Sequence, residues 1–161
     1  TGDPRLAETV MGPVIDEAAA ALVESRISQT LAGGANLLAG GTREGTLVAP
    51  TVLRNVAADA PVIAEETFGP VIAIRSFRDP AAAICEVNAG DYGLQAGVFT
   101  NDHALVKLFS RELAVGGVMI NEGPDFRAEH GPFGGIKRSG LGREGVRITL
   151  REMSETKVVI D

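Results

Sequence analysis

Two carboxylates and an aromatic ring stand together in the sequence EETFGPV, residues 65–71. A Gly-Pro pair closes this stretch, and a run of apolar residues follows it directly. At the mouth of an α/β sheet, a carboxylate can accept hydrogen bonds from both hydroxyls of a ribose while a ring packs on the apolar edge of the sugar. A plain loop would explain the same residues, so the pattern alone leaves both interpretations open.

A second group of chemically able residues lies in a glycine-rich stretch, residues 122–145, which directly follows an apolar run. It holds two rings, Phe126 and Phe133, and the guanidinium of Arg127. The rings could line a ligand channel while the guanidinium pairs with an anionic group, or both rings could fix the loop to the core. Ordered loops of this length are usually functional.

Other familiar chemistries are disfavoured by their context. The sequence GLGREG at residues 140–145 matches a dinucleotide-binding fingerprint, but a loop rather than a strand precedes it and the chain ends too soon after it. Cys85 lies in a predicted helix with no cationic residue within four positions, which predicts an inert core thiol. His103 and His130 are too isolated to predict a metal site. We therefore expect no metal site in this chain, and no catalytic role for Cys85.

The elements that must position these residues follow from periodicity and turn signals. A helical rhythm covers residues 14–31, and two short apolar runs around a glycine cluster predict a hairpin-like strand pair at a sheet edge, 36–39 and 48–56. Strands and helices then alternate: strand 71–77, helix 81–89, strand 96–100, helix 102–113, strand 117–121. A last helix, 143–153, precedes a terminal strand, 156–160. This alternation predicts an α/β fold, a Rossmann-like parallel sheet with helices on both faces.

Composition narrows the range of partners. The 161 residues carry a net charge of −6, which disfavours nucleic acid and anionic membranes as partners. No apolar run is long enough to span a bilayer, and the single cysteine excludes an internal disulfide. The simplest expectation is a cytoplasmic protein. The first residue is Thr1 rather than methionine, which suggests a piece of a longer chain.

Several motifs in a fixed order carry a family resemblance: EETFGPV at 65–71, Asn121, PFGGIK at 132–137, Ser139 with Gly140, GRE at 142–144 and ETK at 155–157. Together they resemble the aldehyde dehydrogenase superfamily over nearly the whole chain. The resemblance implies that residues 1–153 are the C-terminal part of the catalytic domain. Residues 154–161 would then be an oligomerisation strand, with same-protein subunits forming a dimer or tetramer.

The resemblance also implies the chemistry of the parent enzyme. A cysteine thiolate attacks a small aldehyde, hydride passes to NAD or NADP, and a glutamate-activated water releases the carboxylate. In the family these catalytic groups lie upstream of the segment that this chain resembles, so the chain alone is expected to be inactive. The alternative is a stand-alone, non-catalytic module that binds a nucleotide or a protein.

The resemblance implies a role only for those residues that match the motifs of the family. Glu66 corresponds to the acceptor for the nicotinamide ribose hydroxyls, and Phe68 to the ring that packs beside that sugar. Asn121, Phe126 and Phe133 correspond to the substrate-binding segment. The run NEGPDFR, residues 121–127, resembles the branch that takes small polar or anionic aldehydes such as lactaldehyde. We expect Arg127 to pair with a substrate anion.

Overall fold

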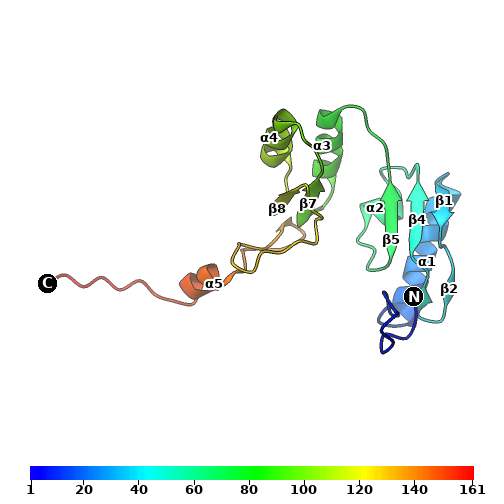
Figure 1. The fold of residues 1–161 in the computed structure, drawn as a ribbon, viewed down its shortest axis with the longest axis horizontal. Coiled ribbons are helices and arrows are strands. Elements are labelled where there is room, and N and C mark those ends of the chain that lie inside the picture. The colour runs from blue at the N-terminus through cyan, green and yellow to red at the C-terminus, as the bar shows by residue number, and fades with distance from the viewer. The chain divides into compact units, whose positions relative to one another are not determined.

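The computed structural model describes all 161 residues and divides into two compact units, Thr1–Arg78 and Asp79–Asp161 (Figure 1). Each unit contains one parallel pair of strands and at least two helices. None of the helices is both long and apolar enough to cross a membrane.

The first unit is built on helix α1, Glu17–Ala32, which confirms the predicted helix. The Asp16 side chain accepts a hydrogen bond from the Ala19 amide at 2.7 Å, and this N-cap satisfies a donor that the first helical turn leaves free. One side of α1 is buried, at the helical spacing that an amphipathic helix requires: Ala20, Val23, Ile27 and Thr30.

A three-stranded sheet, in the order β1-β4-β5, completes the first unit. Strand β1, Asn36–Ala39, runs antiparallel to β4, Thr51–Arg54, and β4 runs parallel to β5, Val71–Ile74. The antiparallel pair was predicted at a sheet edge, but within this pair only β1 is an edge strand, because β4 is the central strand. Two short elements fill the connections: the hairpin of β2, Arg43–Glu44, with β3, Leu47–Val48, and helix α2, Pro61–Ala64.

The core of this unit lies between α1 and the strands. Val48 belongs to the same buried cluster as Val23 and Ile27, and Val71 packs against that cluster from β5. Side chains alternate along β5, so Ile72 and Ile74 are exposed while their neighbours are half-buried. Because Val71 packs against the core, the turn that leads into β5 is held at the edge of the core.

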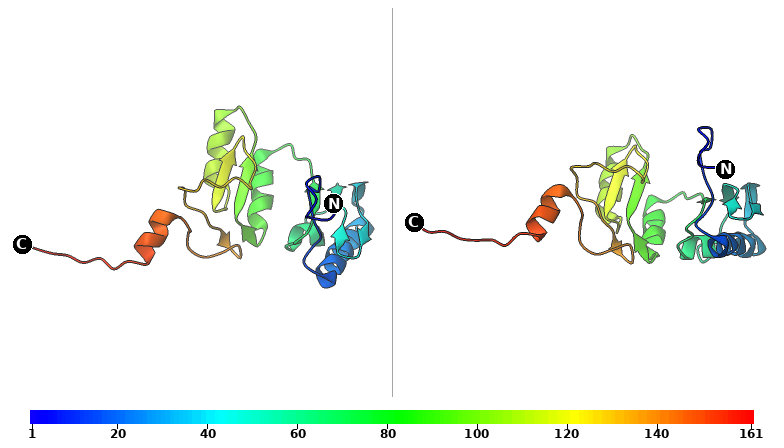
Figure 2. Two further views of the ribbon diagram at one scale, coloured as in Figure 1. Left: turned by 60° about the horizontal axis from the view of Figure 1, so that its bottom comes forward. Right: turned by 90° about the horizontal axis from the view of Figure 1, so that it is seen from below.

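The second unit begins with helix α3, Pro80–Ala89, whose N-cap Asp79 accepts from the Ala81 amide at 3.0 Å. Strands β7, Gln95–Val98, and β8, Gly117–Ile120, are parallel, and helix α4, His103–Glu112, connects them. Figure 2 shows α3 and α4 beside this strand pair. The predicted strand-helix-strand order of this region is confirmed.

The stretch that follows β8 is a long loop tied at two points. Strand β9, Ile136–Lys137, pairs antiparallel with β6, Tyr92–Gly93, and Phe133 forms an isolated bridge with Glu144. Helix α5, Val146–Glu152, ends the regular structure. The bridge closes residues 133–144 into a folded turn, which restricts the side chains nearby.

The α/β class is confirmed, but the predicted burial of Cys85 was wrong. Strand β5 pairs with β4 in the first unit, and β7 pairs with β8 in the second. Residues 154–161 have no strand partner within the single chain (Figure 1), and their role as an oligomerisation strand stays a prediction. Cys85 is exposed rather than in the core, because α3 buries only Ile84.

Candidate functional site

The turn at residues 65–70 connects α2 to β5 and carries the first predicted site residues. Its end is fixed to the sheet, because the Thr51 amide donates to the Pro70 carbonyl at 2.8 Å. Its middle lies close to α1, where a side chain at Gly69 would overlap Val23. The turn is therefore held by both the helix and the central strand of its unit.

Arg26 of α1 provides the polar part of that attachment. Its side chain is only 11% exposed, and its Nη2 lies 2.6 Å from Oε2 of Glu65. Nη1 donates to the backbone carbonyl of Glu66 and lies 3.5 Å from the Thr67 hydroxyl oxygen. One guanidinium thus contacts three successive residues of the turn.

Glu66 and Phe68 are left available for a ligand. The Glu66 carboxylate is exposed and has no hydrogen-bond or ion-pair partner, in contrast to that of Glu65. The Phe68 ring is not used in the core, since the residue is 83% exposed. A free carboxylate can accept two hydroxyl hydrogen bonds and a free ring offers apolar surface, so these residues fit a ribose.

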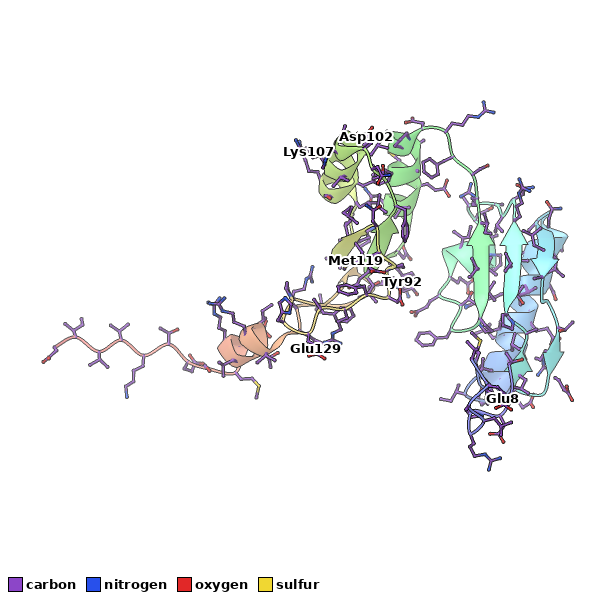
Figure 3. The ribbon with its side chains drawn as sticks, in the orientation of Figure 1. Glu8, Tyr92, Asp102, Lys107, Met119 and Glu129 are labelled. Atoms are coloured by element: carbon purple, nitrogen blue, oxygen red, sulfur yellow. The ribbon has the colours of Figure 1, made fainter.

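The second group of predicted residues lies on the loop after β8, on which Figure 3 labels Glu129. Arg127 Cζ lies 4.3 Å from the centroid of the Phe133 ring, and Arg127 Nη2 lies 2.9 Å from Glu144 Oε2. The side chains of Arg127 and Glu144 are both more than half exposed. A guanidinium stacked on a ring in this way keeps its outward N–H donors available to an anion.

Hydrogen bonding to the backbone of Phe126, rather than packing of its ring, fixes the position of this residue. Gln95 of β7 donates to the Phe126 carbonyl at 3.0 Å and also to the Pro124 carbonyl. The residue is 49% exposed, so its ring is not simply buried against the core. The alternative that both rings serve only to pin the loop therefore fits Phe133, which is half-buried, better than Phe126.

Asn121 follows β8 in a left-handed conformation, with φ of 57°. Its Oδ1 accepts a hydrogen bond from the Thr100 amide at 2.8 Å, which joins the ends of β7 and β8. Asparagine tolerates this backbone conformation better than most residues do. The structure thus gives Asn121 a role in joining the strand ends, and no hydrogen bond links it to Arg127.

Three residues that contact the site were not found from the sequence: Arg26, Gln95 and Glu144. Each lies far along the chain from the residue that it holds, so local patterns give no signal for it. Glu144 does lie inside the glycine pattern that was set aside as a nucleotide fingerprint. Strand β9 ends at Lys137, before that pattern begins, so no strand runs directly into the glycines.

Comparison with known proteins relates the chain to one family. The model of the aldehyde dehydrogenase family matches residues 1–159. A sulfoacetaldehyde dehydrogenase from Neptuniibacter caesariensis is 43% identical over 159 residues, which are 99% of this chain and 35% of that protein. A lactaldehyde dehydrogenase from Methanococcus maripaludis is also 43% identical over 159 residues, 99% of this chain and 34% of that protein.

A solved structure agrees with the sequence comparisons. The glyceraldehyde-3-phosphate dehydrogenase of Methanocaldococcus jannaschii, complexed with NADP, superposes with a TM-score of 0.85 and 41% identity. The match covers 89% of this chain and 31% of that one. The chain therefore spans about one third of the length of the relatives that it matches.

Proposed function

Because this chain belongs to the aldehyde dehydrogenase family, we propose that it is part of an enzyme that oxidises a small aldehyde to its carboxylate with NAD or NADP. The observation that carries the proposal is the unpartnered Glu66 carboxylate beside the exposed Phe68 ring. When bound, the cofactor supplies the acceptor for the hydride of the aldehyde carbon. The chain's own residues bind and orient the two reactants.

Glu66 and Phe68 would hold the cofactor. The carboxylate would accept hydrogen bonds from both ribose hydroxyls, and the ring would cover the apolar edge of the sugar. Glu65 is a poorer candidate for this role, because its carboxylate is already paired with Arg26 at 2.6 Å. The complex of the Methanocaldococcus relative with NADP supports a dinucleotide as the ligand.

Arg127, Phe126 and Phe133 would receive the aldehyde. Arg127 donates to Glu144 through one nitrogen, and its other N–H groups have no protein partner. They could bind a sulfonate, phosphate or carboxylate on the substrate by charge-assisted hydrogen bonds. The activity named for the Neptuniibacter relative concerns an anionic aldehyde, which favours a small anionic or polar substrate here too.

The attack on the aldehyde carbon and the release of the carboxylate would need groups outside this chain. Cys85, the single cysteine, is a poor candidate for the nucleophile, because it lies on the exposed side of α3 without a histidine or lysine partner. We therefore propose that the chain alone does not turn over aldehyde. Its terminal residues 154–161 would add to a neighbouring subunit and contribute to a dimer or tetramer.

A hybrid enzyme tests this proposal. In this hybrid, the chain replaces the 159 matching residues of the sulfoacetaldehyde dehydrogenase from Neptuniibacter caesariensis. Reduction of NAD or NADP is followed by absorbance with sulfoacetaldehyde, glyceraldehyde 3-phosphate and lactaldehyde, for the hybrid and for the isolated chain. We expect activity from the hybrid only, and turnover by the isolated chain would overturn the assignment of the catalytic groups.

Substitution of Glu66 tests the cofactor site directly. Glu66→Gln in the hybrid keeps the size of the side chain but removes the charge, so the Kd for NADPH should rise about tenfold. Glu44→Gln is a matched control, because Glu44 is an exposed acid on β2 with no site contact. An unchanged Kd in Glu66→Gln would contradict the ribose-binding role. Cofactor binding by the isolated chain, with a folded but inactive hybrid, would favour a non-catalytic binding module.

A further inference from the structure

We infer that Arg26 is a positioning residue for the cofactor site: it neutralises Glu65 and fixes the backbone at Glu66, so that only the Glu66 carboxylate is presented to the ribose. This inference rests on the proposed cofactor role of Glu66. It adds a residue from α1 that neither the sequence motifs nor the comparisons point to. All the contacts that carry it lie within the first unit.

The first step of the argument is that Arg26 is committed to the turn. A guanidinium whose side chain is 11% exposed must be satisfied by protein acceptors, and the turn supplies the Glu65 carboxylate, the Glu66 carbonyl and the Thr67 hydroxyl. Arg26 Nε is buried without a partner of its own. Movement of the turn would leave further N–H groups of Arg26 without acceptors, which costs free energy. The turn therefore resists displacement.

The second step is that α1 holds the turn at two places. Val23 and Arg26 are three residues apart and therefore lie on the same side of the helix. Val23 packs where the turn passes Gly69, so closely that a side chain there would overlap it. Arg26 holds the chain at Glu66. These two attachments bracket Phe68 and fix the direction in which both ligand-facing side chains leave the backbone.

The third step is the difference that Arg26 creates between two adjacent carboxylates. Glu65 is paired at 2.6 Å, whereas Glu66 has no partner. A carboxylate that is free but attached to a fixed backbone loses less conformational entropy when it binds. Arg26 therefore raises cofactor affinity without touching the cofactor.

Two measurements on the same variants separate positioning from general stability. Amide hydrogen exchange of residues 65–68 is measured on the 161-residue chain without cofactor, and the Kd for NADPH is measured on the hybrid enzyme by fluorescence. For Arg26→Gln we expect faster exchange and a Kd raised about tenfold, because the loosened turn must be ordered when the cofactor binds. Arg26→Lys should recover part of both effects.

Two further substitutions keep the test informative if Arg26→Gln unfolds. Glu65→Gln removes the Arg26–Glu65 ion pair by changing its more exposed partner. It should also speed exchange and raise the Kd, but by less than Arg26→Gln does. Glu24→Gln is the matched control, because it removes an ion pair of 2.9 Å between α1 and Arg43 without touching the turn. It should leave both measurements unchanged.

The possible results distinguish this inference from the proposed function. If Arg26→Gln and Glu65→Gln leave both exchange and Kd unchanged, the inference is wrong. If they speed exchange but leave the Kd unchanged, Arg26 has only a structural role, and the inference is also wrong. Glu66→Gln should raise the Kd without altering exchange, and its failure to raise the Kd would refute the ribose contact instead.

Discussion

Arg127 and Glu144 form an ion pair of 2.9 Å across the loop after β8, and the same guanidinium lies over the Phe133 ring. Phe133 and Glu144 also form a backbone bridge, so the stacking and pairing partners of Arg127 are fixed to each other. Arg127 is therefore oriented before any substrate arrives. The Glu144 carboxylate competes with an anionic substrate for this guanidinium. The strength of the Arg127–Glu144 ion pair therefore decides how readily an anionic substrate is bound.

Replacement of Arg127 should change specificity rather than general activity. In the hybrid enzyme, Arg127→Ala is expected to raise the KM for glyceraldehyde 3-phosphate about tenfold or more, because charge-assisted hydrogen bonds are lost. The KM for neutral lactaldehyde should change much less. Arg127→Lys is the control that keeps the charge but loses the planar fork. Equal changes for both aldehydes would exclude an anion-binding role.

Replacement of Glu144 should have the opposite effect. Both partners are largely exposed, so the pair contributes at most about 1 kcal/mol, or roughly a fivefold change in affinity. Glu144→Gln removes the competing charge, and the KM for the anionic aldehyde should fall by up to that factor while the KM for lactaldehyde stays constant. The comparison is made at one ionic strength, because exposed charges are screened by salt. A rise in the anionic KM would show that Glu144 mainly holds Arg127 in place.

The N-cap of α4 offers a test of local stability. Asp102, which Figure 3 labels at the start of this helix, accepts from the Ala104 amide at 2.7 Å. Asp102→Ala should lower the free energy of unfolding by about 1 kcal/mol, measured by urea denaturation with helical circular dichroism. Asp102→Asn keeps an acceptor and should stay close to the parent chain. An equal loss in both variants would assign the effect to the charge rather than to the cap.

Gly116 tests the close packing at the start of β8. A side chain there would overlap the Gly134 carbonyl, so Gly116→Ala should destabilise the chain by roughly 1–3 kcal/mol in urea denaturation. Gly33→Ala is the control, because Gly33 has an ordinary φ of −76° and a side chain there would meet only normal contacts. If both glycines tolerate alanine equally, the loop can move away from β8 without cost.

The terminal segment tests the proposed assembly. Val158, Val159 and Ile160 are between 76% and 90% exposed, and residues 154–161 have no strand partner in the single chain. Deletion of these residues should abolish concentration-dependent association in sedimentation, because the pairing edge is gone. Leu141→Asp removes an exposed apolar side chain elsewhere and should leave association intact. A monomeric parent chain whose terminal amides are protected from exchange would contradict the proposal.

The sequence predicted local features better than distant pairings. The starts of α3 and α4 follow from Asp79 and Asp102, whose caps depend only on nearby amides. The position of Cys85 could not be predicted in this way, because alanines cover much of α3 and the apolar pattern does not select one buried side. The pairing of β5 with β4 could not be predicted either, because single-strand patterns do not encode the choice of partner.

The same reasoning applies to the site. Glu66, Phe68 and Arg127 belong to motifs and were found from the sequence, since their chemistry is visible in their own neighbourhood. Arg26 and Glu144 complete their geometry from distant positions, which only the fold brings close. Motifs therefore suggested the groups proposed to contact ligands, and the structure identified the residues that contact those groups.

The bridge between Phe133 and Glu144 has a consequence for the order in which the two binding regions form during synthesis. The turn of Glu66 is complete as soon as β5 has left the ribosome. Arg127 must wait until Glu144 emerges, because its ion-pair partner lies beyond the loop that it orients. A nascent chain therefore gains the proposed cofactor-side geometry first and the substrate-side geometry only after Glu144 has emerged.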